Sequence, residues 1–157
     1  MNDIRFVHVN LVAKDWLALA EFYQRVFQCE LILPERDIND EWLEESTGIE
    51  NAHIKGAHLR LPGFSDGKGP TLEIFQYTPA KEAEAVAANQ RGFGHIAFLV
   101  DDVEKVVNDV LENGGTAVGE LVKTHIEGVG DLTFRYMRDP EGNIIEVQNW
   151  SYGTCKS

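Results

Sequence analysis

Hydrophobic positions along the chain change their spacing in the same order at two places. Residues 7–15 form an apolar strand pattern centred on His8, and the period then lengthens to that of a helix that ends near Gln28. Residues 94–102 repeat this pattern around His95, an offset of 95 − 8 = 87 residues. Each change from the period of a strand to the period of a helix predicts a βα unit.

The second helix has the clearer pattern of the two. Asp101 and Glu104 resemble a capping box at its start, and Gly114 with Gly115 predicts its end. Both helices are expected to lie against a sheet, because each has a single apolar stripe. That stripe consists of Trp16, Leu19, Ala20, Tyr23 and Val26 in the first helix, and of Val103, Val106, Val107, Val110 and Leu111 in the second.

Three further strand patterns follow each helix, so the repeating unit is predicted to be βαβββ. The last two strands are joined by residues 139–143, where Pro140 and Gly142 are typical of a tight hairpin turn. The expected strands are near 29–34, 54–61 and 71–77 in the first copy, and near 116–123, 131–138 and 143–149 in the second.

The last strands of the two copies also match, and each contains one glutamate, Glu73 or Glu146. The separation from His to Glu is 73 − 8 = 65 residues in the first copy and 146 − 95 = 51 in the second. The first copy therefore holds an insertion of 65 − 51 = 14 residues, which we place in the acidic stretch 36–51. A short helix that caps one end of the sheet is one interpretation of this stretch. A solvated loop anchored by Trp42 and Leu43 is preferred over a functional lid.

The repeat divides the chain into two modules within one compact domain. Residues 1–78 form the first module, residues 79–91 a short connecting helix or linker, and residues 92–157 the second module. A chain of 157 residues leaves no room for a separate regulatory domain.

The charge and the cysteines exclude several classes of partner and compartment. The formal net charge of −12 would repel nucleic acid and anionic membrane surfaces. Cys29 and Cys155 are far apart, and without a secretory signal or a membrane-spanning run they are expected to be reduced thiols. We therefore expect a cytoplasmic protein that acts on a small molecule.

Four ionisable residues interrupt apolar strands at matching places in the two copies: His8, Glu73, His95 and Glu146. An ionised carboxylate in such a strand costs several kcal/mol unless a cation or several hydrogen-bond donors compensate it. One divalent ion would stabilise all four groups, since imidazole and carboxylate together bind Zn²⁺, Ni²⁺, Co²⁺, Mn²⁺ or Fe²⁺. Zn²⁺ and Ni²⁺ are preferred.

Strand alternation predicts that the two glutamates point to one face of their strands. Leu72, Ile74, Ile145 and Val147 point to the opposite face. The remaining histidines do not recur in both copies and are placed on surfaces or pocket rims. His58 is the reserve ligand among His53, His58 and His125. The substrate-binding candidates are Asn10, Phe75, Tyr77, Gln148 and Trp150.

At these residues the chain resembles the vicinal-oxygen-chelate superfamily, which includes glyoxalase I, methylmalonyl-CoA epimerase, extradiol dioxygenases and bleomycin-resistance proteins. The most specific motif is the turn Asp-Pro-Glu-Gly-Asn at 139–143, which leads to Glu146. Phe27-Gln28-Cys29 departs from the Leu-Gly pair that is common there. The other motifs that carry the resemblance are 6–9 with Asp15, 21–23, 72–75 and 94–98.

The resemblance implies an α+β fold in which two paired βαβββ modules form an open curved sheet around a metal site. It makes His8, Glu73, His95 and Glu146 the ligands of one divalent ion. It also implies a lyase or isomerase that chelates vicinal oxygens and moves a proton through an enediolate. Glu146 is the expected base and Glu73 its partner.

Two other classes remain open, an extradiol-type dioxygenase that uses Fe²⁺ and a metal-free binding or resistance protein. A fourth ligand at Glu73 counts against the first class, and the full set of metal groups counts against the second. The substrate is a glutathione hemithioacetal, a coenzyme A thioester or another hydroxycarbonyl compound. A homodimer is expected, with the site within one chain or shared by two.

Overall fold

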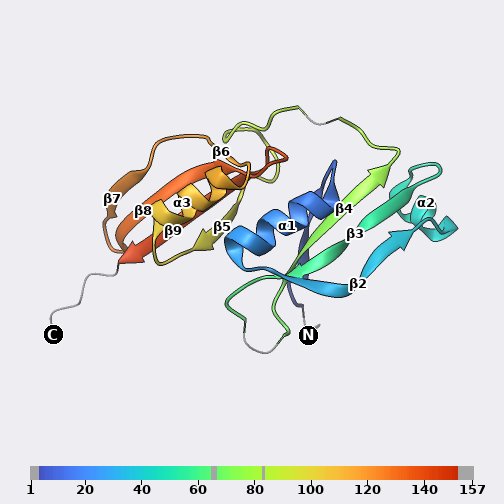
Figure 1. Ribbon diagram of the computed structural model, residues 1–157, viewed down its shortest axis with the longest axis horizontal. Coiled ribbons are helices and arrows are strands. Elements are labelled where there is room, and N and C mark those ends of the chain that lie inside the picture. The colour runs from blue at the N-terminus through green and yellow to red at the C-terminus, as the bar shows by residue number, and fades with distance from the viewer. Residues whose placement is uncertain (1–3, 65–66, 83, 152–157) are drawn as a thin grey trace. The chain divides into compact units, whose positions relative to one another are not determined.

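The computed structural model describes residues 4–64, 67–82 and 84–151 of the chain. It contains two compact units, Met1–Ala83 and Glu84–Ser157, both drawn in Figure 1. The boundary between them falls inside the predicted linker 79–91. The fold is α+β, as expected, and each unit has a mixed β-sheet of its own.

Unit 1 has the predicted βαβββ order with one helix inserted. In its sheet the strands are arranged β1-β4-β3-β2, with β1 parallel to β4 and the other pairs antiparallel. The strand β2 is longer than the predicted 29–34 and has a register shift between Ile32 and Arg36. The elements are β1 (His8–Val12), α1 (Trp16–Phe27), β2 (Glu30–Ile38), α2 (Glu41–Thr47), β3 (His53–Arg60) and β4 (Thr71–Thr78).

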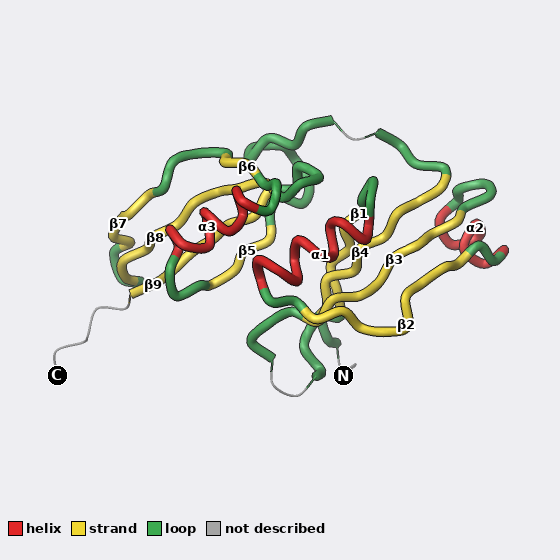
Figure 2. The backbone as a smooth tube through the Cα atoms, viewed as in Figure 1, coloured by secondary structure: helices red, strands yellow, loops and turns green. Residues whose placement is uncertain are grey.

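The helix α1 covers one face of this sheet, as the ribbon and the tube both show (Figures 1 and 2). Asp15 caps its start, because the side-chain Oδ1 accepts a hydrogen bond from the backbone N–H of Ala18 at 3.1 Å. The predicted apolar stripe is buried apart from Trp16, and Tyr23 is completely enclosed. Beneath the helix lie the fully buried side chains of Leu59, Leu72 and Ile74.

The insertion at 36–51 contains the short helix α2, so the prediction of a simple loop is wrong and the prediction of a small helix is confirmed. Leu43 is buried and packs in a cluster with Ala52, Ile54 and Phe75. Trp42 is 52% exposed, so Leu43 alone anchors the helix. Ile38 and Ile49, from the same stretch, pack against this cluster as well, so apolar burial holds the acidic stretch on the sheet.

Unit 2 repeats the arrangement with a sheet in the order β5-β9-β8-β6, to which β7 adds by pairing with β8. The strand predicted at 116–123 is therefore two separate pieces, β6 and β7, on the same edge of β8. The other strands match the predictions closely. The elements are β5 (Ile96–Leu99), α3 (Val103–Glu112), β6 (Thr116–Ala117), β7 (Val122–Ile126), β8 (Gly130–Arg138) and β9 (Ile144–Ser151).

Two predicted helical features differ from the structure. Asp102, rather than Asp101, caps α3, and its side chain accepts from the N–H of Lys105 at 3.0 Å. Residues 79–82 and 84–91 are loop and turn, so the connecting helix predicted at 79–91 is absent from the described part of that segment. Its alanines favour a helix, but a short helix without a buried face is marginal in water, and these residues are largely exposed.

The hairpin turn at 139–143 forms as predicted, and the structure shows what holds it. Asp139 is 3% exposed, and its Oδ1 accepts from the backbone N–H groups of Glu141 and Asn143, both at 2.9 Å. Gly142 has a φ of 92°, a conformation that suits glycine. The turn fixes the register of β8 and β9 and with it the position of Glu146.

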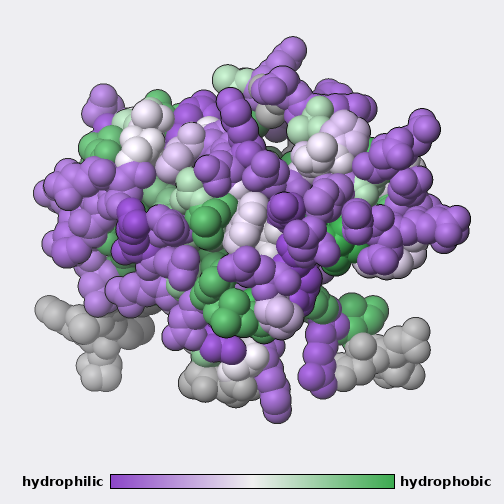
Figure 3. Space-filling model, turned by 45° about the vertical axis from the view of Figure 1, so that its right-hand side comes forward, coloured by the Kyte–Doolittle hydropathy of each residue, from purple (hydrophilic) through white to green (hydrophobic). Residues whose placement is uncertain are grey.

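Hydrophilic residues cover most of the molecular face drawn in Figure 3, in keeping with the net charge of −12. No helix within the described residues is both long enough and apolar enough to cross a membrane.

Candidate metal centre

Glu73 lies on β4, between the two neighbouring strands of the sheet in unit 1. Backbone pairing places Asn10 of β1 opposite Glu73 on one side and His58 of β3 opposite it on the other. Burial along β4 follows the predicted alternation, because Leu72 and Ile74 are fully buried under α1. The Glu73 side chain on the other face is 13% exposed.

Two histidines approach the carboxylate of Glu73. The Nε2 atom of His58 is 3.0 Å from its Oε1, and the Nε2 atom of His8 is 3.6 Å from its Oε2. The ligand atoms of His8, His58 and Glu73 all lie within 4.8 Å of one another. Donors bound to one ion at about 2.0–2.2 Å are separated from one another by roughly 3–4 Å. Both His–Glu distances fall within that range, so these three side chains form a candidate site for a divalent ion.

Two hydrogen bonds orient the side chains of Glu73 and His58. The amide Nδ2 of Asn10 donates to Oε2 of Glu73 at 2.9 Å, and Nδ1 of His58 lies 3.0 Å from the hydroxyl oxygen of Thr71. Burial lowers the pKa of His58, and the nearby charge of Glu73 only partly opposes this effect. His58 is therefore biased toward the neutral form, which is the form that binds metals.

Unit 2 places a second His–Glu pair at the equivalent strand positions. His95 immediately precedes β5, and its Nε2 is 3.0 Å from Oε2 of Glu146 on β9. Glu146 also has a side chain that is 13% exposed. Opposite Glu146 on β8 is Tyr136, whose ring centroid is 5.1 Å from that of His95. Burial raises the pKa of Tyr136, and the charge of Glu146 adds to this effect.

The structure thus brings the four predicted ligands together as two pairs, His8 with Glu73 and His95 with Glu146. Each pair lies within its own unit, and one ligand set made from all four residues stays a prediction. The sequence predicts His58 at a surface or pocket rim and names it as the reserve ligand. It lies within the cluster of unit 1, beside His8 and Glu73.

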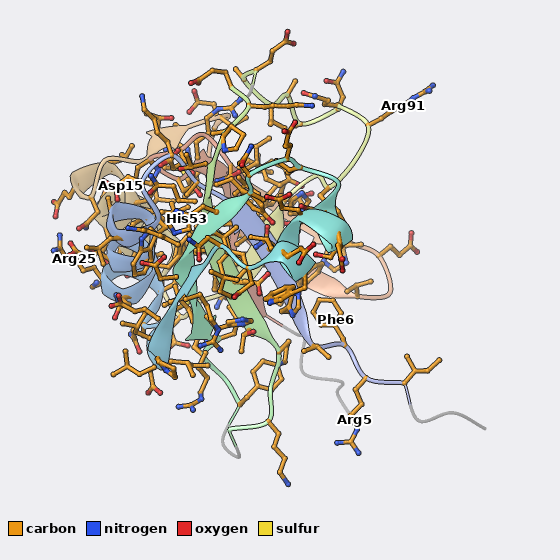
Figure 4. All side chains as sticks on the ribbon, turned by 90° about the vertical axis from the view of Figure 1, so that its right-hand side faces the viewer. Arg5, Phe6, Asp15, Arg25, His53 and Arg91 are labelled. Atoms are coloured by element: carbon orange, nitrogen blue, oxygen red, sulfur yellow. The ribbon has the colours of Figure 1, made fainter. Side chains whose placement is uncertain are left out.

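The two remaining histidines lie on the surface as predicted. His53 pairs with Asp37, and His125 pairs with Asp131. Figure 4 shows His53 on β3 and Phe6 on the segment before β1, where Phe6 is 72% exposed.

The proposed substrate-binding side chains have varied surroundings. Phe75 is 9% exposed, packs in the Leu43 cluster and touches the ring of His58 with centroids 6.2 Å apart. Tyr77 packs against the same cluster. In unit 2 the indole Nε1 of Trp150 donates to the side-chain oxygen of Gln148 at 2.9 Å. Asn10 contacts Glu73 directly, as described above.

Chemically, each unit offers a carboxylate with an imidazole at its side, and in unit 1 the carboxylate also accepts a hydrogen bond from Asn10. Such a group can accept a proton or coordinate a cation. Glu73, Glu146, His8, His58 and Tyr136 project from strands that are packed on their opposite face, which limits their movement, whereas His95 immediately precedes β5.

Comparison with proteins of known sequence gives a relative at low identity. The chain is 27% identical over 146 residues to the lactoylglutathione lyase GLX1 of Arabidopsis thaliana. The match covers 93% of this chain and 44% of that protein, so the chain spans less than half the length of the relative.

Solved structures share the fold. A glyoxalase family protein from Bacillus cereus superposes with a TM-score of 0.74 at 21% identity, covering 97% of this chain and 96% of that chain. A glyoxalase I variant from Zea mays superposes with a TM-score of 0.63 at 23% identity, covering 92% of this chain and 44% of that chain.

The family model of the Glyoxalase/Bleomycin resistance protein/Dioxygenase superfamily matches residues 5–147. That range includes β1 of unit 1, the hairpin turn of unit 2 and all four predicted ligands. The chain therefore belongs to the Glyoxalase/Bleomycin resistance protein/Dioxygenase superfamily.

Proposed function

We propose that this protein is a metal-dependent lyase or isomerase of the glyoxalase type that acts on a small carbonyl compound. One observation carries the proposal. Two units of the same design each place a histidine Nε2 beside a strand glutamate, at 3.6 Å in one unit and 3.0 Å in the other. A purely structural origin would not require both residue types to recur at the same strand positions.

In this proposal His8, Glu73, His95 and Glu146 hold one divalent ion, Zn²⁺ or Ni²⁺ in the first place and Fe²⁺, Co²⁺ or Mn²⁺ otherwise. A bound cation would stabilise negative charge on the substrate oxygen, which makes a neighbouring C–H acidic enough to lose its proton. Glu146 takes that proton from the carbon, and Glu73 acts as its counterpart in proton return. Asn10, which donates to Glu73, keeps that carboxylate in position.

The substrate is proposed to be a small molecule with adjacent oxygens, such as a glutathione hemithioacetal or a coenzyme A thioester. The relative from Arabidopsis thaliana, a lactoylglutathione lyase, favours the first of these. We further propose a cytoplasmic homodimer. Support for a dimer comes from apolar side chains beside the edge strands β1 and β5, where Phe6 is 72% and Leu99 70% exposed.

A dioxygenase is the second candidate, because one observation specifically favours it. His8, His58 and Glu73 form a set of two histidines and one carboxylate, the combination found in non-haem Fe²⁺ oxygenases. Oxygen consumption with catechols would identify this activity.

The deciding experiment follows the uptake of deuterium from D₂O at the carbon of hemithioacetal and thioester substrates, by NMR, with and without a chelator. Glu73→Gln and Glu146→Gln are each expected to slow the exchange at least ~100-fold, since a positioned base contributes about 10²–10⁴-fold. Glu112→Gln removes an exposed acid of unit 2 and is expected to keep the rate. Exchange that survives both the chelator and the two variants would refute the proposal.

A further inference from the structure

The two units carry the same residue type at two equivalent positions but differ at a third. His8 and His95 are equivalent, as are Glu73 and Glu146. Opposite the glutamate on the next strand, however, unit 1 has His58 and unit 2 has Tyr136. Within the part of the chain that the structure describes, three metal-binding side chains therefore come together in unit 1 alone, as the cluster of His8, His58 and Glu73.

We propose that His58 is a metal ligand, so that unit 1 holds a divalent ion through His8, His58 and Glu73 alone. The inference rests on the proposed function in one respect, that the chain binds a divalent ion. It differs from that proposal in making the residues of unit 2 unnecessary for retention of the ion. Unit 2 would then contribute its pair, His95 and Glu146, to chemistry on the substrate.

The surroundings of His58 match those of a ligand histidine. Its Nε2 points toward Glu73 at 3.0 Å, and its Nδ1 is 3.0 Å from the hydroxyl oxygen of Thr71. Ligand histidines almost always use the second ring nitrogen in such a hydrogen bond, which fixes the ring and leaves the first nitrogen for the metal. When Nδ1 carries the proton and donates to Thr71, the lone pair of Nε2 is directed at the cluster.

Glu73 is supported in the same way. Asn10 donates to Oε2 at 2.9 Å, whereas Oε1 lies nearest to His58. The side chain of Glu73 is 13% exposed and that of His58 is 21% exposed. A cation would offset the cost of holding this carboxylate away from water. The cluster thus has two imidazoles, a largely buried acid and hydrogen bonds that orient two of its three members.

The test measures metal binding by the full chain rather than its activity. Binding of Zn²⁺ is titrated against a chromogenic chelator for the wild type, His58→Gln and the double variant His95→Gln/Glu146→Gln. We expect the double variant to keep one ion per chain, and His58→Gln to weaken binding by at least ~100-fold, beyond what loss of a supporting residue costs. His53→Gln, on the same strand but in a surface pair with Asp37, is the matched control and is expected to bind as the wild type does.

A second variant guards against misfolding of His58→Gln. Thr71→Val keeps the size of the side chain but removes the hydroxyl that orients His58, and it is expected to weaken Zn²⁺ binding by roughly 10-fold. Electron paramagnetic resonance of Cu²⁺ bound to the double variant is expected to show two coordinated imidazoles. The same measurement on His58→Gln in that background should show one at most.

The outcomes separate this inference from the proposed function. If the wild type binds an ion and the double variant loses it, His58 is not a sufficient third ligand and the inference is overturned while the proposed function stands. If binding follows the expectation but no deuterium exchange occurs with any substrate, the proposed function fails and the metal site stands. A wild-type chain that binds no ion would overturn both.

Discussion

At the scale of single residues, Gln28 has a backbone conformation that is unfavourable for its side chain. It ends α1 with a φ of 56°, in the left-handed region where helices usually place glycine. The left-handed conformation costs a residue with a Cβ roughly 1–2 kcal/mol, and glycine removes this cost. The greater freedom of glycine in the unfolded chain offsets part of the stability gained. We therefore expect Gln28→Gly to raise the free energy of unfolding by about 0.5–1 kcal/mol, measured by urea denaturation.

The matched control is Gln24→Gly, which makes the same chemical change inside α1, where the backbone is helical. This variant is expected to lower the free energy of unfolding by about 1 kcal/mol. Equal losses for the two variants would show that the left-handed conformation of Gln28 is not strained.

At the scale of elements, the insertion α2 depends on one side chain. Leu43 is 4% exposed and packs on Ala52, Ile54 and Phe75, while the neighbouring Trp42 is 52% exposed. We expect Leu43→Ala to lower the stability of this helix by about 2–4 kcal/mol, a typical cost of removing a buried leucine side chain. Hydrogen exchange at the α2 amides measures that change, even where the rest of unit 1 stays folded.

Trp42→Ala provides the comparison, since substitution of an exposed side chain usually changes stability by no more than about 0.5 kcal/mol. A larger effect from Trp42 than from Leu43 would contradict the packing described here. Phe75 links this helix to the metal centre because its ring contacts His58 as well as the Leu43 cluster. Unfolding of α2 is thus expected to change the packing of the Phe75 ring and, through it, the position of His58 in the candidate site.

The repeat explains how much of the molecule the sequence could predict. The spacing of hydrophobic residues and the recurrence of His and Glu are enough to predict the βαβββ order and both His–Glu pairs, since these features depend on local sequence patterns. The sequence predicts Asp101 as the cap of α3, whereas Asp102 caps it, because either of two adjacent aspartates suits that role. The sequence makes His58 only a reserve ligand, because its position depends on pairing with β4, and the second copy, with Tyr136, does not repeat it.

At the scale of the whole molecule, a bound ion is expected to stabilise the folded chain, because it binds the folded state and not the unfolded one. Zn²⁺ at 100 times its dissociation constant adds about 2.7 kcal/mol. For a chain of 157 residues this corresponds to a rise in Tm of roughly 5–10 °C. Differential scanning calorimetry with and without a chelator measures it.

The net charge of −12 makes a control essential, since cations also gather on an acidic surface without a specific site. Glu73→Gln removes the acid that contacts both His8 and His58 but changes the overall charge by a single unit. The increase in Tm is therefore expected to disappear in this variant if the ion binds at the cluster. Mg²⁺ should have little effect even on the wild type, because it prefers oxygen ligands to imidazole. An equal rise in Tm for the wild type and Glu73→Gln would mean that the stabilisation comes from the acidic surface, because only a specific site loses its ion when one carboxylate is replaced.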